Sequence, residues 1–309
     1  MMKKLLQPRI WKRIYLERAG EPLLYNLVSV FIALFGNIVQ KIAYDLVPRQ
    51  PYAFGLQQAF EFAQREREAL AIKRLVFIEF GVASGAGLLN ICQIGERLSR
   101  HYGLPFRVLG FDTGGGLPEP VDYRDHPEKY LDGDYVPHDI DALDRALPAN
   151  AQIIYGQIAE TILDIPALLE PGDVIAFVSV DVDYWSSTKN CLTLFINTRL
   201  PFLPKTPVYL DDVNNVDHHP FAGELLAVAE FNDDHGSRKI VKMNQLRNWR
   251  IFKAALWLDQ MYWFLDLEHG YFTRAYHASR KRAQLSNPYL GRRVIPPSHA
   301  ARTPPENCS

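Results

Sequence analysis

The sequence predicts an α/β protein with a Rossmann-like, doubly wound, mostly parallel seven-stranded sheet, helices on both faces and a helical extension at the N-terminus. Two observations predict this fold. Short apolar segments of strand length alternate with longer segments of helical periodicity, a pattern typical of parallel sheets that are covered on both faces. The apolar segments also end in acidic residues or glycine, at the position where such sheets bind ligands.

The first 50 residues are expected to form a basic and apolar helical extension. Residues 1–18 carry six Lys or Arg and one acid, and residues 23–39 are strongly apolar but interrupted by polar residues and glycine. A bilayer span needs roughly 20 mostly apolar residues, so this segment is short for one. Three interpretations remain open: a helix buried against the main domain or a second copy of the chain, a membrane-surface anchor, and a true span. Pro48 and Pro51 end the unit.

The main domain is expected to cover residues 51–277 and to begin with a helix over 52–70. Apolar periodicity predicts strands at 75–81, 106–112, 151–156, 173–183 and 207–213, with further candidates at 239–243 and within 257–267. Helices are expected at 86–100, 158–170, 186–198 and 221–234.

Two irregular segments complete the chain. Residues 113–150 are acidic, aromatic and rich in Gly and Pro, and a connection this long in a compact domain usually forms a lid or a wall of the substrate site. Residues 278–309 form a basic, proline-containing segment that is expected to be a disordered tail.

The charge distribution and the cysteines indicate where the protein is located and which partners it has. The three cysteines, Cys92, Cys191 and Cys308, are far apart and odd in number, which argues against a disulfide scaffold and favours a reducing compartment. We therefore expect a cytoplasmic protein, with the inner face of the membrane as a candidate location because both ends are basic. The acids are in excess between the two ends, which is not the charge pattern of a nucleic-acid groove, so no nucleic-acid partner is expected.

The turn after the first strand, EFGVASGAG (79–87), carries the first candidate binding residues. Its glycines lack the spacing of the dinucleotide fingerprint, and Glu79 favours an ammonium or a hydroxyl over a phosphate. Asp112 ends the second strand, where an acid accepts hydrogen bonds from ribose hydroxyls. S-adenosylmethionine carries both an amino-acid head and a ribose. The turn also contributes Ser84 and three glycines, Gly81, Gly85 and Gly87. These glycines allow the backbone to approach a ligand closely. Alternatively, they serve only to let the strand and the helix pack tightly.

The ends of the fourth and fifth strands carry four acids: Asp181, Asp183, Asp211 and Asp212. If the fourth strand continues through position 183, Asp181 and Asp183 point to one face. Carboxylates from adjacent strand ends form an oxygen-rich site that suits Mg²⁺ better than Zn²⁺. Such a metal lowers the pKa of a bound hydroxyl, and a carboxylate outside the metal shell takes the proton. Alternatively, these acids only cap helices, with Asp183 or Ser186 capping the helix that follows.

Two histidines follow the second acidic pair in the segment VDHHPF. His218 or His219 is a candidate base or ligand if the loop folds back over the strand ends. The alternative is that both histidines are solvated. We carry His218 forward as a second catalytic candidate beside Asp183.

Over about residues 75–215 the chain resembles class I S-adenosylmethionine-dependent methyltransferases, and among them the macrocin O-methyltransferase family of sugar O-methyltransferases. The likeness rests on the segments IEFGVASGAG, GFDTGGGLPEP, YGQIAETI, and VDVDYWSST with LDD. It implies that Asp181, Asp211 and Asp212 hold Mg²⁺, and that Asp183 is a base for the acceptor hydroxyl. It also implies that Gly156 and Gln157 lie near the adenine, with Asp181 close to the cofactor. Val182 stands where the family usually has glycine.

The sequence therefore predicts an S-adenosylmethionine-dependent, Mg²⁺-assisted O-methyltransferase that acts on a hydroxyl of a sugar, a glycolipid or another small molecule. Two alternatives remain open. The first is a Mg²⁺-dependent glycosyltransferase with an Asp-x-Asp motif, which leaves Glu79 and the glycine-rich turn unexplained. The second is a non-catalytic methyltransferase-like module. A peripheral membrane contact and a homo-oligomer are further partner hypotheses.

Overall fold

The computed structural model describes residues 18–215, 217–273, 275–278, 285 and 287. The described residues up to Phe272 lie in one compact unit, and those from Thr273 belong to a second. The expected basic N-terminal segment 1–17 and nearly all of the expected tail 278–309 lie outside the described residues.

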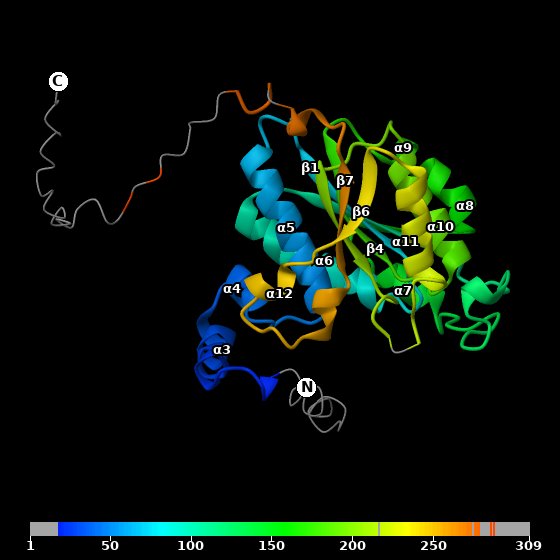
Figure 1. Ribbon diagram of the computed structural model, residues 1–309, viewed down its shortest axis with the longest axis horizontal. Helices are drawn as coiled ribbons and strands as arrows, with labels where there is room; N and C mark the ends of the chain where they lie inside the picture. The colour runs from blue at the N-terminus through cyan, green and yellow to red at the C-terminus, as the bar shows by residue number, and fades with distance from the viewer. Residues whose placement is uncertain (1–17, 216, 274, 279–284, 286, 288–309) are drawn as a thin grey trace, which may run out of the picture. The chain divides into compact units, whose positions relative to one another are not determined.

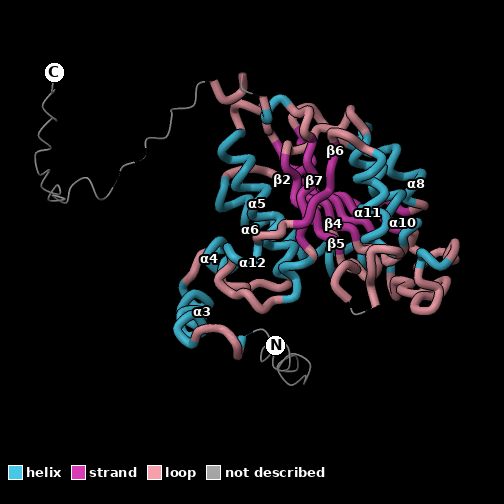
Figure 2. The backbone as a smooth tube through the Cα atoms, viewed as in Figure 1, coloured by secondary structure: helices cyan, strands magenta, loops and turns pink. Residues whose placement is uncertain are grey.

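Seven strands form one mixed sheet (Figure 1, Figure 2). They are β1 (Arg74–Phe80), β2 (Phe106–Asp112), β3 (Ala151–Tyr155), β4 (Asp173–Val180), β5 (Lys205–Leu210), β6 (Arg238–Lys242) and β7 (Met261–Asp266). The strand order is β3-β2-β1-β4-β5-β7-β6, and β7 runs antiparallel to both of its neighbours while the other pairs are parallel. The expected Rossmann-like α/β fold is confirmed, and the two further strand candidates form its antiparallel edge.

Helices cover both faces of the sheet (Figure 1). On one face lie α5 (Gln50–Glu66) and α6 (Ala86–Tyr102), and on the other lie α8 (Ile158–Thr161), α9 (Ile165–Leu168), α10 (Trp185–Leu192) and α11 (Gly223–Asp234). The shorter helices are α7 (Ile140–Ala146) and α12 (Leu246–Trp249), with 3₁₀ turns at Tyr123–Asp125, Ile162–Asp164, Thr193–Ile196, Leu256–Asp259 and Gly270–Phe272.

The sheet separates two apolar cores because side chains alternate along each strand. In β1, Leu75 and Phe77 belong to the core under α5 and α6. Val76 and Ile78 belong to the core under α8, α10 and α11. β4 is buried at every position, as expected for a central parallel strand.

Two expected elements differ from the structure. The fourth strand ends at Val180 and not at 183, because Asp183 has a left-handed φ of 60° and the chain turns there. Asp181 and Asp183 therefore do not continue one strand, and the expectation that they point to one strand face is wrong. The helix expected over 158–170 is divided into α8, a 3₁₀ turn and α9, with Pro166 in the first turn of α9.

The N-terminal extension forms two helices, α3 (Leu23–Phe35) and α4 (Ile38–Ala43). Gly36 ends α3, and Asn37 begins α4 with a capping box in which Asn37 and Gln40 exchange side-chain to backbone hydrogen bonds. Ile38 and Ile42 of α4 join the core under α5. No helix among the described residues has both the length and the apolar character needed to cross a membrane.

Candidate active site at the carboxyl ends of the parallel strands

A cavity of about 410 Å³ opens at the carboxyl ends of β1, β2, β4 and β5. The strand order reverses direction between β1 and β4, and open α/β sheets bind their ligands at this kind of switch point. The long connection after β2 forms one wall, as expected, through Thr113, Gly116, Leu117, Pro118, Lys129, Tyr130 and Tyr135.

Most of the candidate cofactor residues line this cavity, namely Glu79, Gly81, Ser84, Gly87, Asp112 and Asp181. Gly85 does not line the cavity: it begins α6 with a φ of 78°, and a Cβ there would lie 2.1 Å from a methyl carbon of Leu143. Gly156 and Gln157 also lie outside the lining, but they lead directly into Ile158, which lines it. Their proximity to an adenine stays a prediction.

Glu79 is a buried acid with one free oxygen. The Tyr52 hydroxyl donates to Glu79 Oε1 over 2.8 Å, and Ser179 donates to the Tyr52 oxygen over 2.9 Å. Oε2 has no hydrogen-bond partner among the residues that the structure describes. Burial raises the pKa of Glu79 to about 8, against the lowering effects of the Tyr52 hydrogen bond and the Arg49 charge. A side chain at position 87 would displace the Glu79 carboxylate, because a Cβ there would lie 2.0 Å from Glu79 Oε1.

Asp112 holds the glycine-rich turn in place. Its Oδ2 accepts hydrogen bonds from the backbone N–H groups of Val82 and Ala83, both over 2.8 Å. Its Oδ1 accepts one from Gly114 over 2.7 Å. A carboxylate offers about four acceptor positions, so one remains on Oδ1 for a ligand hydroxyl. The ribose contact of Asp112 stays a prediction, and the structural contact to the turn is an added role.

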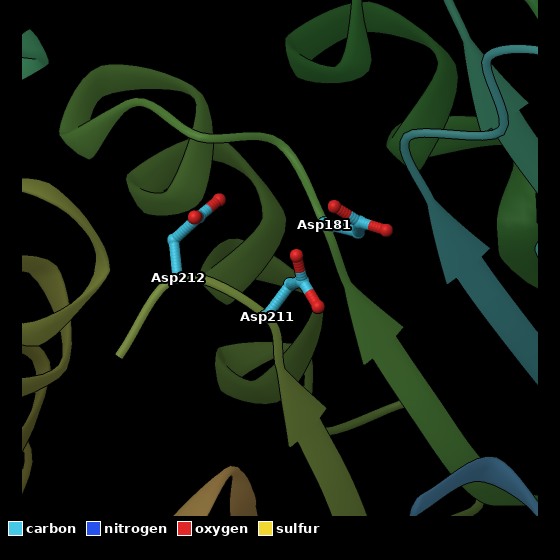
Figure 3. A group of neighbouring side chains, drawn as sticks. All are labelled: Asp181, Asp211 and Asp212. Atoms are coloured by element: carbon cyan, nitrogen blue, oxygen red, sulfur yellow. The ribbon is translucent and has the colours of Figure 1, made fainter. Parts of the chain in front are cut away.

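Three of the four acids come together (Figure 3). Asp181 follows β4, Asp211 and Asp212 follow β5, and one carboxylate oxygen from each lies within 4.8 Å of the others. Asp212 Oδ2 is buried, with no hydrogen-bond partner in the described part of the chain, while its Oδ1 accepts from Asn215 over 3.0 Å. An oxygen-only donor set with an unsatisfied buried oxygen fits a hard divalent cation such as Mg²⁺.

The electrostatics of this group also favour a bound cation. Burial, followed by repulsion from Asp211, raises the pKa of Asp181 well above its usual range. Burial also raises the pKa of Asp211, although the Tyr209 hydroxyl donates to it. Beneath them Glu224 accepts from the Asp212 backbone N–H over 2.9 Å, and burial keeps its pKa high. Ionisation of all these acids together is unfavourable, and a bound cation would offset their mutual repulsion.

Asp183 lies in the cavity wall beside the acid group but outside it. Its φ of 60° is uncommon for a residue other than glycine, and such strained positions concentrate at functional sites. Burial, and then repulsion from Asp212, raises the pKa of Asp183 to about 7. A carboxyl group with these properties is suited to take up a proton at neutral pH.

His218 lies at the edge of the site, and its side chain does not line the cavity. Its Nδ1 donates to the backbone carbonyl of Asp212, so its Nε2 is an acceptor, and the Lys129 ammonium donates to that atom over 2.7 Å. Burial lowers the pKa of His218, which agrees with a neutral ring. The catalytic role of His218 stays a prediction. His219 contacts the ring of His126.

Sequence reasoning missed Arg49 as a site residue. It precedes α5 with a left-handed φ of 46°, lines the cavity and lies over the Tyr52 ring at 5.3 Å. Its guanidinium is close enough to Glu79 and Asp181 for their charges to interact. No sequence motif marks it, since it lies 30 residues before Glu79 and reaches the site only through packing.

Sequence reasoning also missed Asp125, which ties the long connection to helix α10. This fully buried carboxylate accepts hydrogen bonds from the backbone N–H and the hydroxyl of Ser186, both over 2.8 Å, and from the Val121 N–H over 2.9 Å. Asp125 therefore caps α10 from the long connection, because it accepts a hydrogen bond from a first-turn N–H that has no partner within the helix. The expectation that Asp183 or Ser186 caps this helix is replaced by this contact, which holds the cavity wall beside Asp183.

Comparisons with known proteins give structural neighbours only. No family model and no curated protein matches the sequence. The chain is similar to the solved structure of CalS11, a calicheamicin methyltransferase, with 22% identity and a TM-score of 0.42 over 59% of this chain and 73% of that one.

Two further solved structures are similar to the chain. One is loganic acid methyltransferase with SAH, with 15% identity and a TM-score of 0.26 over 52% of this chain and 54% of that one. The other is the plantazolicin methyltransferase BpumL in complex with SAH, with 10% identity and a TM-score of 0.28 over 71% of this chain and 83% of that one. All three are described as methyltransferases.

Proposed function

We propose that this protein is an S-adenosylmethionine-dependent, Mg²⁺-assisted O-methyltransferase that acts on a hydroxyl of a small molecule, with a sugar as the favoured acceptor. The observation that carries the proposal is the charge arrangement of the cavity. The cavity is lined by the carboxyl group of Glu79 and the guanidinium of Arg49, which form no ion pair with each other among the described residues. It is also lined by the three carboxylates of Asp181, Asp211 and Asp212.

The pair of Glu79 and Arg49 matches the amino-acid head of the methyl donor. Glu79 Oε2 is buried and free to accept from the ammonium, and the Arg49 guanidinium is free of hydrogen bonds among the described residues and suits the carboxylate. The remaining acceptor position on Asp112 Oδ1 suits a ribose hydroxyl. The adenine is then assigned to the side of Ile158, next to Gly156 and Gln157.

The acid group is the proposed place for Mg²⁺, which when bound lowers the pKa of the acceptor hydroxyl. Asp183 borders the cavity next to this group and takes the hydroxyl proton. The acceptor oxygen then forms a bond to the methyl carbon while the bond from that carbon to sulfur breaks, leaving SAH and the methyl ether. The protein's own contribution is to hold the two reactants in line and to keep the base at the oxygen.

The wall formed by the long connection is the proposed acceptor surface. Tyr130 and Tyr135 line the cavity with Lys129, and the Tyr130 hydroxyl donates to Asp212 Oδ1 over 3.4 Å. Aromatic faces beside hydrogen-bonding groups suit an amphipathic acceptor such as a sugar. The Asp-x-Asp glycosyltransferase alternative does not account for Glu79, Arg49 and the glycine-rich turn in the same cavity.

Arg49→Gln is expected to weaken SAH binding roughly 10- to 100-fold, because a charge-assisted hydrogen bond to the ligand carboxylate is lost. Binding of 5′-methylthioadenosine, which has the adenosine and sulfur but no amino acid, is expected to stay unchanged. Isothermal titration calorimetry of wild type and variant with both ligands measures this. Arg145→Gln, an exposed change on α7, is the control.

The same titrations separate two kinds of failure. If wild type binds neither ligand but binds a nucleotide sugar, the methyltransferase proposal is wrong. If wild type binds SAH and Arg49→Gln weakens both ligands equally, the proposal stands but Arg49 does not hold the carboxylate.

Glu79 is expected to make the ligand-free protein less stable as pH rises. Its pKa is about 8 in the folded state, above the ordinary value of 4.5, so between these values the folded state binds more protons than the unfolded one. The free energy of unfolding therefore falls from about pH 5 to about pH 8 and then levels off. Glu79→Gln, which stays neutral, is expected to be more stable than wild type by roughly 3–5 kcal/mol at pH 8.5 and to differ from it by less than about 1 kcal/mol at pH 5.

Urea unfolding of both proteins across this pH range measures the difference. SAH binding by Glu79→Gln is expected to be weaker despite the gain in stability, because the ammonium loses its charged partner. A constant stability difference between the two proteins from pH 5 to pH 8.5 would contradict this account of Glu79.

A further inference from the structure

Helix α3 exposes its apolar side. Its large apolar side chains face solvent, with Leu23 74%, Leu34 69% and Phe35 72% exposed, and Leu24, Leu27, Val30 and Phe31 similarly exposed. Its buried positions are Ser29 and Ile32, and the Ser29 hydroxyl donates to the Tyr25 carbonyl. Surface helices normally bury their apolar side and expose their polar side. An apolar surface of this size marks an interaction site.

Contacts on both sides of α3 fix its orientation. Before the helix, Arg18 donates to the Tyr44 carbonyl over 2.9 Å and lies over the Phe252 ring at 3.6 Å, and Glu21 accepts from the Ala254 N–H over 2.8 Å. After α4, Asp45 accepts from Arg250 over 2.6 Å. Since both ends of the segment are held, the apolar face of α3 is presented outward.

A basic hollow borders the end of α3. This hollow, about 380 Å³, is lined by Gly36, Asn37 and Ile38 of the extension and by three side chains from the end of α6: Arg97, Arg100 and His101. All three α6 residues are exposed. The sequence before α3 adds five Lys or Arg in residues 1–17. Positive charge beside an exposed apolar helix is the combination that binds anionic membrane surfaces.

We infer that α3 lies in the plane of an anionic phospholipid surface, with its apolar side chains at the acyl boundary and Arg97 and Arg100 at the headgroup phosphates. With 13 residues at about 1.5 Å each, α3 is too short to cross a hydrocarbon core of about 30 Å, so it lies on the surface. A two-fold contact between copies through α3 is less favourable, because it would bring the basic side chains of two hollows together, with Glu96, 3.4 Å from Arg100, as the acid paired with them.

The inferred membrane surface and the cavity lie toward the same end of the sheet. α4 ends at Ala43, and only six residues later Arg49 lines the cavity. Figure 1 shows α3 and α4 on the side of the molecule to which the loops after β2 and β5 also project. Docking through α3 therefore brings the cavity close to the lipid surface.

Vesicle co-sedimentation of the full chain tests the inference. Wild type is expected to bind vesicles of phosphatidylcholine mixed with phosphatidylglycerol, and to bind vesicles of phosphatidylcholine alone at least roughly tenfold more weakly. Leu27→Ser with Phe31→Ser is expected to lower binding to the mixed vesicles roughly 100-fold, through lost apolar insertion. Arg97→Gln with Arg100→Gln is expected to lower it about tenfold and to reduce its salt dependence.

Two matched controls change exposed residues elsewhere. Leu163→Ser removes an apolar side chain that is 75% exposed, and Arg145→Gln with Arg199→Gln removes two exposed charges. Both controls are expected to bind as wild type does, and all variants to melt like wild type because only exposed side chains change. If wild type does not bind the mixed vesicles, or the controls lose binding as much as the α3 variant does, the inference is wrong. A dimer in sedimentation velocity that Leu27→Ser with Phe31→Ser abolishes, without lipid binding, would assign α3 to a second copy instead.

Discussion

Asp183→Asn is expected to lower kcat roughly 10²- to 10⁴-fold, the usual cost of losing a general base. The amide keeps the shape of the carboxylate but cannot take the proton of the acceptor hydroxyl. Because Asp183 lies outside the group of Asp181, Asp211 and Asp212, the variant is expected to keep Mg²⁺ binding and SAH binding. Asp211→Asn is the informative contrast, since it removes a proposed metal ligand and is expected to abolish the heat of Mg²⁺ binding.

Three measurements check this prediction: methyl transfer to a panel of hydroxylated sugars, calorimetry with Mg²⁺, and calorimetry with SAH. Asp233→Asn, an exposed change near the end of α11, is the control and is expected to behave as wild type does. Full activity in Asp183→Asn would remove Asp183 as the base. An equal loss of Mg²⁺ binding in Asp183→Asn and Asp211→Asn would show that Asp183 belongs to the metal site.

Gly81→Ala is expected to have the largest structural effect of any single substitution at the site. A Cβ at position 81 would lie 1.8 Å from the backbone carbonyl oxygen of Asp181, and the φ of 83° is itself unfavourable for alanine. The turn after β1 and the segment after β4 would have to move apart, and both carry proposed ligand groups. We expect a loss of roughly 3–5 kcal/mol in the free energy of unfolding, together with loss of SAH binding.

Gly103→Ala separates the cost of the close contact from the cost of the left-handed backbone. Gly103 ends α6 with a similar φ of 65°, but a Cβ there would meet no atom within 4 Å. This control is expected to lower the free energy of unfolding by only about 1–2 kcal/mol, because alanine is unfavourable in the left-handed backbone conformation. It is expected to leave SAH binding unchanged. Urea unfolding of both variants measures the difference. If the two variants are equally stable, the contact between Gly81 and the Asp181 carbonyl does not constrain the site.

The sequence was most informative where the signal is local. The five parallel strands lie within a few residues of their expected positions. Four of them are largely buried, and a strand buried on both faces is a continuous apolar run that contrasts with amphipathic helices. The acids at the strand ends were visible for the same reason: once the strands are recognised, their last residues must meet at one edge of the sheet. Asp181, Asp211 and Asp212 do meet there.

Contacts between residues that are distant in the sequence could not be predicted from local patterns. The sequence by itself determined the α/β class, the carboxyl edge as the candidate site and the identity of three clustered carboxylates, because these follow from periodicity and chain direction. Only the tertiary structure decided that Asp183 turns away from the end of β4, that Arg49 completes the cavity, that Asp125 holds its wall, and that α3 presents its apolar side outward. Each of these depends on packing between residues that are remote in sequence or on a backbone angle that no local pattern specifies.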